Sequence, residues 1–108
     1  MKSNRVTLIG YVGKDLSALK TGKGSKRISI RMATHYPIKN EKGETVWLTT
    51  WHDVVAWDNM AEFAERSMVK GSRIIVDGSI EYRTFPDKQG HIRYYTQIKA
   101  HSIMNLDR

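Results

Sequence analysis

Apolar and polar residues alternate with a period of two along most of this chain, and this pattern limits the possible folds more than any other feature. Side chains of a β-strand point alternately to opposite faces, so the alternation predicts strands with one buried face and one exposed face. The segments that follow it are Arg5–Val12, Arg27–Tyr36, Thr45–Trp57, Ser72–Arg83 and His91–Ile103. The sequence therefore predicts an all-β domain of five strands.

The segment from Asn59 to Lys70 has a helical period instead. Its apolar residues recur at helical spacing: Met60, Phe63, Ala64 and Met68. Asn59 with Glu62 resembles a capping box, and Gly71 has the position of a C-terminal glycine cap. One helix between the third and fourth of five strands is the order of the OB-fold, a Greek-key barrel. We therefore expect a single OB-fold domain over residues 1–108.

Three connections are also readable. Thr21–Ser25 predicts a flexible basic loop, Pro37–Gly43 a hairpin tip, and Pro86–Gly90 a turn, since proline presets φ and glycine accepts a positive φ.

The charge and composition exclude several classes of protein. The chain has no cysteine, so a disulfide scaffold and thiolate metal sites are excluded. It has no apolar run long enough to span a membrane or to form a signal peptide. Its formal charge is +7, and residues 1–40 alone carry nine Lys or Arg and one acid. This surplus suggests a polyanionic partner, although a merely basic soluble protein would show it too.

No arrangement of residues predicts catalysis, a metal site or a cofactor. The four histidines (35, 52, 91 and 101) lack the short paired spacing of a zinc site. Neither a phosphate-binding loop nor a Gly-x-Ser-x-Gly motif is present. His52 and Asp53 are neighbours on a strand, so they point to opposite faces and cannot form a dyad. We expect no enzyme.

The aromatic residues give a sharper signal. Trp47, Trp51 and Trp57 share one face of a predicted strand. Exposed rings on a sheet can stack on unpaired bases of any sequence, because every base has a flat π-face. The alternative is that these tryptophans fill the barrel core.

Basic residues lie on the predicted loops beside further rings, Tyr36 and Phe85. Cations that follow phosphates, interleaved with rings that take bases, are typical of a groove for single-stranded nucleic acid. Taken singly, each lysine is equally explained as a solvated side chain. The candidate phosphate-binding residues are Lys20, Lys23, Lys26, Arg27, Lys39, Lys42, Lys70, Arg83, Lys88 and Arg93.

Five motifs in register resemble the bacterial single-stranded DNA-binding proteins over roughly residues 4–106. They are Asn4–Asp15, Thr50–Trp57 with Met60–Glu62, Lys70–Ser72 with Val76–Gly78, Arg83–Asp87 and Gly90–Tyr94. The resemblance implies an OB-fold that binds and protects single-stranded DNA in replication, recombination and repair. It also implies a homotetramer and a place in the cytoplasm, associated with the nucleoid.

The resemblance assigns roles to particular residues. The family's stacking aromatics correspond here to Trp51, Trp57 and Phe85, and the ring at the end of the second strand falls near Tyr36. His52 matches a residue of subunit contacts, and a satisfied, partly buried histidine explains it equally well. Val6 and Leu8 on the first strand complete the interface that we expect.

One feature departs from the family. Members commonly continue into a Gly/Pro/Gln-rich tail with an acidic, apolar tip that recruits other enzymes. This sequence ends at Asn105–Arg108, which puts partner recruitment through such a tip in doubt. The alternative functions are a primosomal accessory or RNA-binding OB protein, and a protein-interaction module.

Overall fold

The predicted strand and helix order is confirmed. The computed structural model describes residues 3–14, 16–20 and 23–107, without the side chains of residues 17–20. Its elements are β1 (Val6–Val12), β2 (Ser17–Lys20), β3 (Lys26–Lys39), β4 (Thr45–Trp57), α1 (Asp58–Ser67), β5 (Arg73–Pro86) and β6 (Ile92–Asn105). The short strand β2, which pairs along β3, was not predicted, because its four residues are too few to show a period.

The six strands form one sheet in the order β1-β5-β6-β4-β3-β2, and β1 also pairs with β3. That extra pairing joins Tyr11 to Ala33 and closes the sheet into a barrel. Gly10 allows the close approach, since a Cβ there would lie 2.1 Å from the carbonyl oxygen of Ala33. The fold is therefore the OB barrel that the element order predicts.

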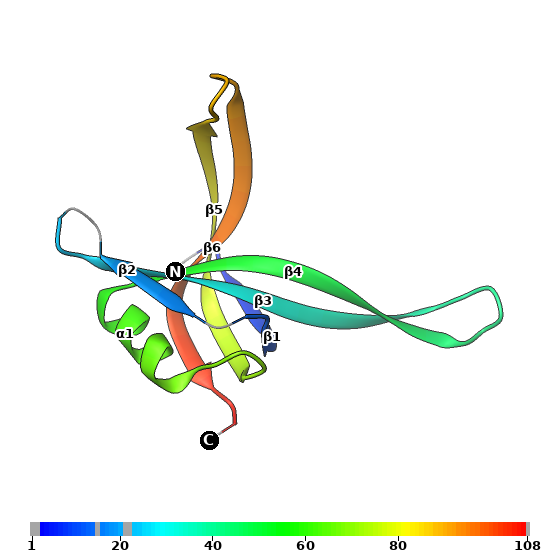
Figure 1. Cartoon of the computed structure of the whole chain (residues 1–108). Coiled ribbons are helices and arrows are strands. Elements are labelled where there is room, and N and C mark those ends of the chain that lie inside the picture. Colours follow the sequence, from blue (N-terminus) through cyan, green and yellow to red (C-terminus); the bar gives the residue numbers. More distant parts are fainter. Residues whose placement is uncertain (1–2, 15, 21–22, 108) are drawn as a thin grey trace.

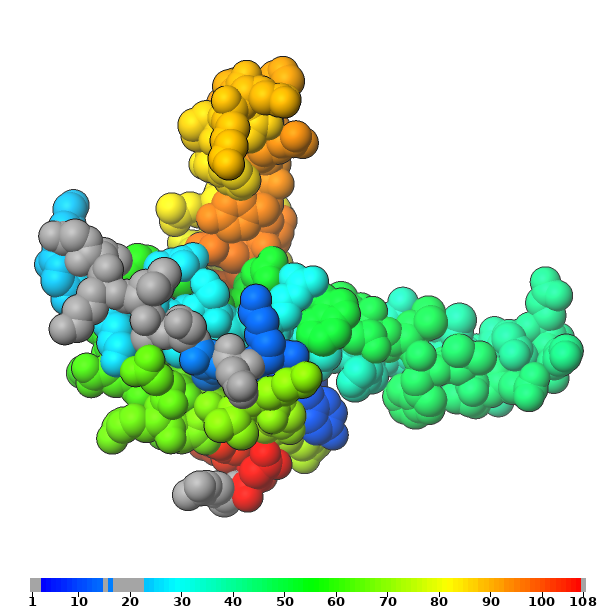
Figure 2. All heavy atoms as spheres, viewed as in Figure 1, coloured from blue at the N-terminus to red at the C-terminus, as the bar shows by residue number. Residues whose placement is uncertain are grey.

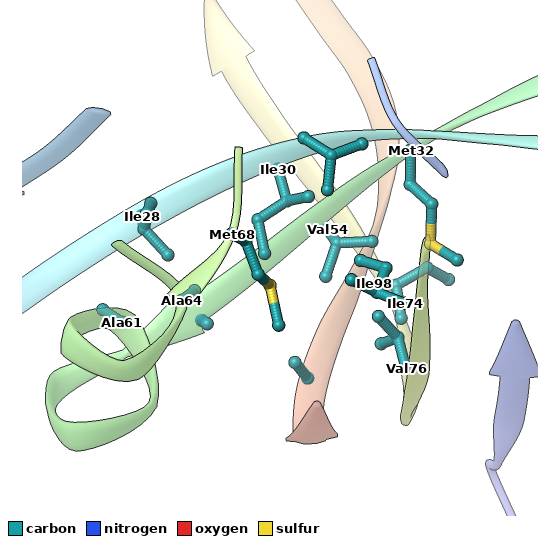
Figure 3. Packing of buried hydrophobic residues seen from close by; sticks show 13 residues of the cluster. Ile28, Ile30, Met32, Val54, Ala61, Ala64, Met68, Ile74, Val76 and Ile98 are labelled. Atoms are coloured by element: carbon teal, nitrogen blue, oxygen red, sulfur yellow. The ribbon is translucent and has the colours of Figure 1, made fainter. Parts of the chain in front are cut away.

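The core lies inside this barrel, and α1 packs against it (Figure 3). Most of the fully buried side chains come from alternate positions of the strands, as the period of two predicts, and include Ile28, Ile30, Val54 and Ile74. Val55, on the other face of β4, is an exception and is fully buried as well. Burying each such aliphatic side chain contributes about 1.5–3 kcal/mol, so the alternating strands supply most of the apolar stabilisation.

The helix differs from its prediction at both ends. It begins at Asp58 and ends at Ser67, and no side-chain hydrogen bond caps its first turn, so the expected pair of Asn59 and Glu62 does not form a capping box. Asn59 already lies inside the helix. Met68 is buried and has an extended backbone, so the chain leaves the helix before Gly71. Gly71 has a φ of 91° in the turn that leads into β5.

Two pairs of strands extend well beyond the barrel as separate arms (Figures 1 and 2). The β3–β4 ribbon runs from the pair Ala33/Trp51 to the pair Lys39/Thr45, and the β5–β6 ribbon from Glu81/Gln97 to Pro86/Ile92. The expected hairpin tip at Pro37–Gly43 is thus shorter, because Pro37 still belongs to β3. A proline is tolerated there since a two-stranded ribbon leaves one edge of each strand without a hydrogen-bonded neighbour.

Candidate nucleic-acid interface

The three tryptophans lie on one face of β4, opposite the core. Val54 and Ala56 point into the barrel, so the odd-numbered residues of β4 lie on the opposite face, where Val55 is the one buried residue. Trp47 is 64% exposed and Trp51 48%, whereas Trp57 is partly buried. We call this side of β3 and β4 the outer face. The structure therefore places the rings on the surface and not in the core.

Two arginines of β3 lie over these rings. The Arg27 guanidinium is 5.9 Å from the ring centre of Trp57, its cross-strand partner. The Arg31 guanidinium is 5.3 Å from the ring centre of Trp51, and its Nη1 donates a hydrogen bond of 2.9 Å to Asp53 Oδ1. Each exposed cation–π contact contributes about 0.5–1 kcal/mol. Cations and rings thus alternate along the outer face.

Gly13 makes room for the ring of Trp51. A Cβ at this glycine would lie 2.4 Å from Cζ3 of Trp51, which is much closer than two carbons can approach. The missing side chain at Gly13, directly after β1, thus lets the Trp51 ring pack against the backbone there.

Trp47 borders an open hollow of about 450 Å³ at the junction of the β3–β4 ribbon and β1. Tyr11, His35 and Arg73 also line it, and the rings of Tyr11 and His35 lie 5.9 Å apart at 44°. Sequence reasoning did not find these three residues. They come from three different strands, so only the barrel's closure brings them together.

The β5–β6 ribbon has a similar outer face, formed by Arg83 and Phe85 with Arg93 and Tyr95 across from them. Phe85 is 46% exposed, and its ring meets Tyr95 edge-on with centres 5.6 Å apart. The predicted ring and both predicted arginines therefore share one surface. Tyr95 was missed, although it has the same parity as Arg93.

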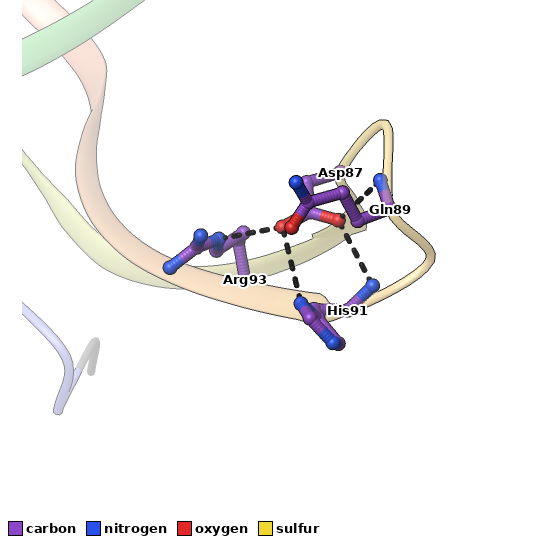
Figure 4. Close-up of polar contacts among 4 residues, drawn as sticks. All are labelled: Asp87, Gln89, His91 and Arg93. Atoms are coloured by element: carbon purple, nitrogen blue, oxygen red, sulfur yellow. Dashed lines mark hydrogen bonds and ion pairs between the residues drawn. The ribbon is translucent and has the colours of Figure 1, made fainter.

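Asp87 organises the tip of this ribbon (Figure 4). Its carboxylate accepts hydrogen bonds of 2.9 Å from the backbone N–H groups of Gln89 and His91, and from Nε of Arg93. Partial burial raises the pKa of Asp87, but these hydrogen bonds outweigh it and hold that pKa below its usual value. The ionised carboxylate therefore fixes both the turn and the direction of Arg93.

The opposite sides of the two ribbons, which we call the inner faces, continue the core side of each strand. Tyr36 lies on the inner face of the β3–β4 ribbon, paired with Leu48, and so does not share the tryptophan face. The inner face of the β5–β6 ribbon carries Tyr82 and Tyr94, both 79% exposed. The residues that form the inner faces are uncharged: Thr34, Tyr36, Ile38, Val46, Leu48, Thr50, Tyr82, Thr84, Pro86, Ile92, Tyr94 and Thr96.

The remaining predicted cations are spread over the surface. Lys39 and Lys42 are exposed near the tip of the β3–β4 ribbon, and Lys88 is exposed at the other tip. Lys26 forms an ion pair of 2.7 Å with Glu65 of α1.

Of the three further lysines, two lie away from both ribbons, and the side chain of the third is not described. Lys23 is exposed before β3, and Lys70 is exposed in the turn between α1 and β5. The side chain of Lys20 lies outside the described residues.

The three residues expected at a subunit interface are partly buried. Val6 and Leu8 pack against the core, and the exposed side of β1 carries Ile9 and Tyr11 instead. His52 Nε2 is 2.9 Å from Oγ1 of Thr34. Burial, and secondarily the charge of Arg31, lower the pKa of His52, while Asp53 raises it.

The described residues offer neither a metal site nor a membrane-spanning helix. They contain no cluster of three His, Asp or Glu side chains that could hold a metal ion. No helix formed by them is long and apolar enough to cross a membrane.

Known proteins resemble this chain over nearly its whole length. The sequence matches the Single-strand binding protein family over residues 3–106. Single-stranded DNA-binding protein 1 of Chlorobaculum tepidum is 31% identical over 104 residues, which are 95% of this chain and 64% of that protein. The single-stranded DNA-binding protein of Rickettsia typhi is 35% identical over 97 residues, 88% of this chain and 64% of the relative. The chain thus spans a little under two-thirds of the length of these curated relatives.

Solved structures agree with the sequence comparison. A Plasmodium falciparum SSB in complex with ssDNA superposes with a TM-score of 0.87 at 25% identity, covering 99% of this chain and 97% of that one. A deletion mutant of the single-stranded DNA binding protein from Thermus aquaticus gives a TM-score of 0.82 at 25% identity, covering 95% and 50%.

Proposed function

This chain belongs to the single-strand binding protein family, and on that premise we propose that it binds and protects single-stranded DNA without sequence preference. The role is binding and not catalysis, in DNA replication, recombination and repair. Its place is the cytoplasm, in association with the nucleoid.

The observation that carries this proposal is the outer face of the two ribbons. Trp47, Trp51 and Phe85 are exposed there, and arginines lie beside them on the same faces. Each base stacked on such a ring contributes about 1–3 kcal/mol, whatever the base. The arginines and the nearby lysines supply phosphate contacts, which are equally independent of sequence.

The same geometry favours single strands over duplex DNA. Bases of a duplex stack on one another and have no free face for Trp51 or Phe85, whereas an unpaired strand can offer consecutive bases to both ribbons. Stacking therefore gives the selectivity, and charge gives the salt dependence.

We expect oligo-dT to quench the tryptophan fluorescence strongly and a duplex of equal length to quench it little. The apparent affinity should fall with salt, with a log–log slope of about −0.7 for each phosphate contacted. Equal binding of single strand and duplex would contradict the proposal. Preference for oligo-U over oligo-dT would redirect it to RNA, where 2′-hydroxyl contacts add affinity.

A homotetramer is the second part of the proposal. An apolar row crosses the outside of the barrel from Ile9 through Ile75 to Met104, which are neighbours in register. Ile9 is 50% exposed and Met104 59%, and a monomer gains nothing from such a row. Burial against other copies would cover it and would let several barrels hold one long strand.

A charge in this row should break the assembly. We expect Met104→Glu to lower the mass in light scattering from four copies of the 12.4 kDa chain towards one or two, because a carboxylate would be buried without a partner. Gln89→Glu adds the same charge at an exposed ribbon tip and should leave the mass unchanged. A wild-type chain that is monomeric at all concentrations would remove the tetramer and leave DNA binding intact.

A further inference from the structure

The outer face of β3 and β4 contains a single acidic side chain, Asp53, among fourteen outward positions of these two fully described strands. On that face Arg31 lies directly across from Asp53, and Trp51 lies two residues before it on β4. The other rings and cations of the face lie further along the two strands: Arg27, His35, Lys39, Trp47 and Trp57. A carboxylate in the middle of a track for phosphates is unfavourable for binding, because like charges repel at short range. Its presence therefore calls for a role.

The contacts of Asp53 show what it does in the free protein. It faces Arg31 directly on the neighbouring strand β3, and Oδ1 accepts a hydrogen bond of 2.9 Å from Nη1 of Arg31. The same guanidinium lies 5.3 Å from the ring centre of Trp51. Both charged side chains are open to solvent, at 41% for Arg31 and 57% for Asp53. Asp53 thus holds Arg31 over the ring that a base would use.

The ion pair of Arg31 and Asp53 differs from that of Arg93 and Asp87 at the tip of the β5–β6 ribbon. Asp87 also holds an arginine, but it accepts backbone hydrogen bonds that define the turn. The polar contact of Asp53 within the described structure is with Arg31. Its carboxylate therefore holds no turn in the way that the carboxylate of Asp87 does.

We propose that Asp53 competes with DNA phosphate for Arg31 and so limits the affinity of the outer face for single-stranded DNA. In the free protein the carboxylate occupies the guanidinium. When a strand binds, a phosphate takes its place, and the freed carboxylate stays beside the DNA. This inference rests on the proposed function and adds a residue that tunes it.

The competition has a distinct signature in salt dependence. In the wild type, the phosphate that binds Arg31 releases a counterion, but the freed carboxylate of Asp53 takes up a cation, so the exchange releases no counterion in sum. Arg31 alone would neutralise one phosphate. Removing the charge of Asp53 should therefore steepen the log–log salt slope by about 0.7, besides raising the affinity at low salt.

The test compares Asp53→Asn with Asp77→Asn in titrations with oligo-dT over a range of salt concentrations. Both variants add one unit to the net charge, and Asp77 also pairs with an arginine, Arg5, at 2.8 Å on another part of the barrel. We expect Asp53→Asn to bind about threefold tighter or more at low salt, with the steeper slope, and Asp77→Asn to resemble wild type. Unchanged or weaker binding by Asp53→Asn would overturn the proposal, as would an equal gain in both variants.

Arg31→Gln separates exchange from simple repulsion. In that background Asp53→Asn should no longer steepen the salt slope, because no guanidinium remains to be released. If the slope steepens all the same, the carboxylate acts by repulsion alone and the exchange is wrong. Failure of the wild type to bind oligo-dT at all would overturn the proposed function together with this inference, whereas wild-type binding without a gain in Asp53→Asn overturns this inference only.

Discussion

Replacing Trp51 and Trp57 together by alanine is expected to weaken oligo-dT binding by about thirtyfold or more. Each lost stack costs about 1–3 kcal/mol, and a loss of 1.4 kcal/mol is a factor of ten in affinity. Neither substitution removes a charge, so the salt slope should stay that of the wild type. Affinities measured by fluorescence anisotropy of a labelled oligo-dT, over a range of salt, check both statements.

Tyr36→Ala is the matched control for this double variant. It removes a ring of the same ribbon, 45% exposed, from the inner face. Because bases are expected to stack on the outer face, Tyr36→Ala should lose much less affinity for oligo-dT than Trp51→Ala. A loss for Tyr36→Ala equal to that of the double variant would show that the strand follows the other side of the ribbon.

Gly10→Ala is expected to destabilise the fold by about 3 kcal/mol or more. The added Cβ would lie 2.1 Å from the carbonyl oxygen of Ala33 and 3.0 Å from its carbonyl carbon. These are backbone atoms of β3, which cannot rotate away as a side chain can. The variant must therefore move β1 away from β3 at the pairing that closes the barrel. Urea denaturation followed by circular dichroism measures the loss.

Thr7→Ala provides the comparison on the same strand. Thr7 is exposed and lies where β1 pairs with β5, so its truncation should change the free energy of unfolding by less than about 0.5 kcal/mol. Equal stability of Gly10→Ala and Thr7→Ala would mean that β1 and β3 do not approach as closely as the structure has them.

Much of the fold and of the tryptophan face follows from local periodicity. A period of two over Thr45–Trp57 puts Val54 and Ala56 on one side and all three tryptophans on the other, whatever the neighbouring strands are. The helical period after Trp57 then fixes the element order, and with it the barrel. These features depend only on residues close in sequence.

For Tyr36, Val6 and Leu8, the alternation predicts a different side of the strand from the one that the resemblance implied. Tyr36 has the parity of Ile30 and Met32, which point into the core, so its ring continues the inner face. Val6 and Leu8 have the parity of the buried Val12, so they pack inward. In each case the alternation alone indicates the side of the strand that the structure shows.

Other features could not be read from the sequence because they depend on distant strands. Tyr11, His35 and Trp47 meet only after β1 pairs with β3 and the barrel closes. The contact of Arg31 with Asp53 needs the register of β3 against β4, which a strand pattern leaves undetermined. Cross-strand register is therefore what the structure adds.

The central claim is that unpaired bases meet the rings of the outer faces. Photocrosslinking of an oligo-dT that carries 5-iododeoxyuridine, with the attached residues located by mass spectrometry, tests it most directly. We expect crosslinks at Trp51, Trp57 and Phe85. Crosslinks confined to Tyr36, Tyr82 and Tyr94 on the inner faces would contradict it.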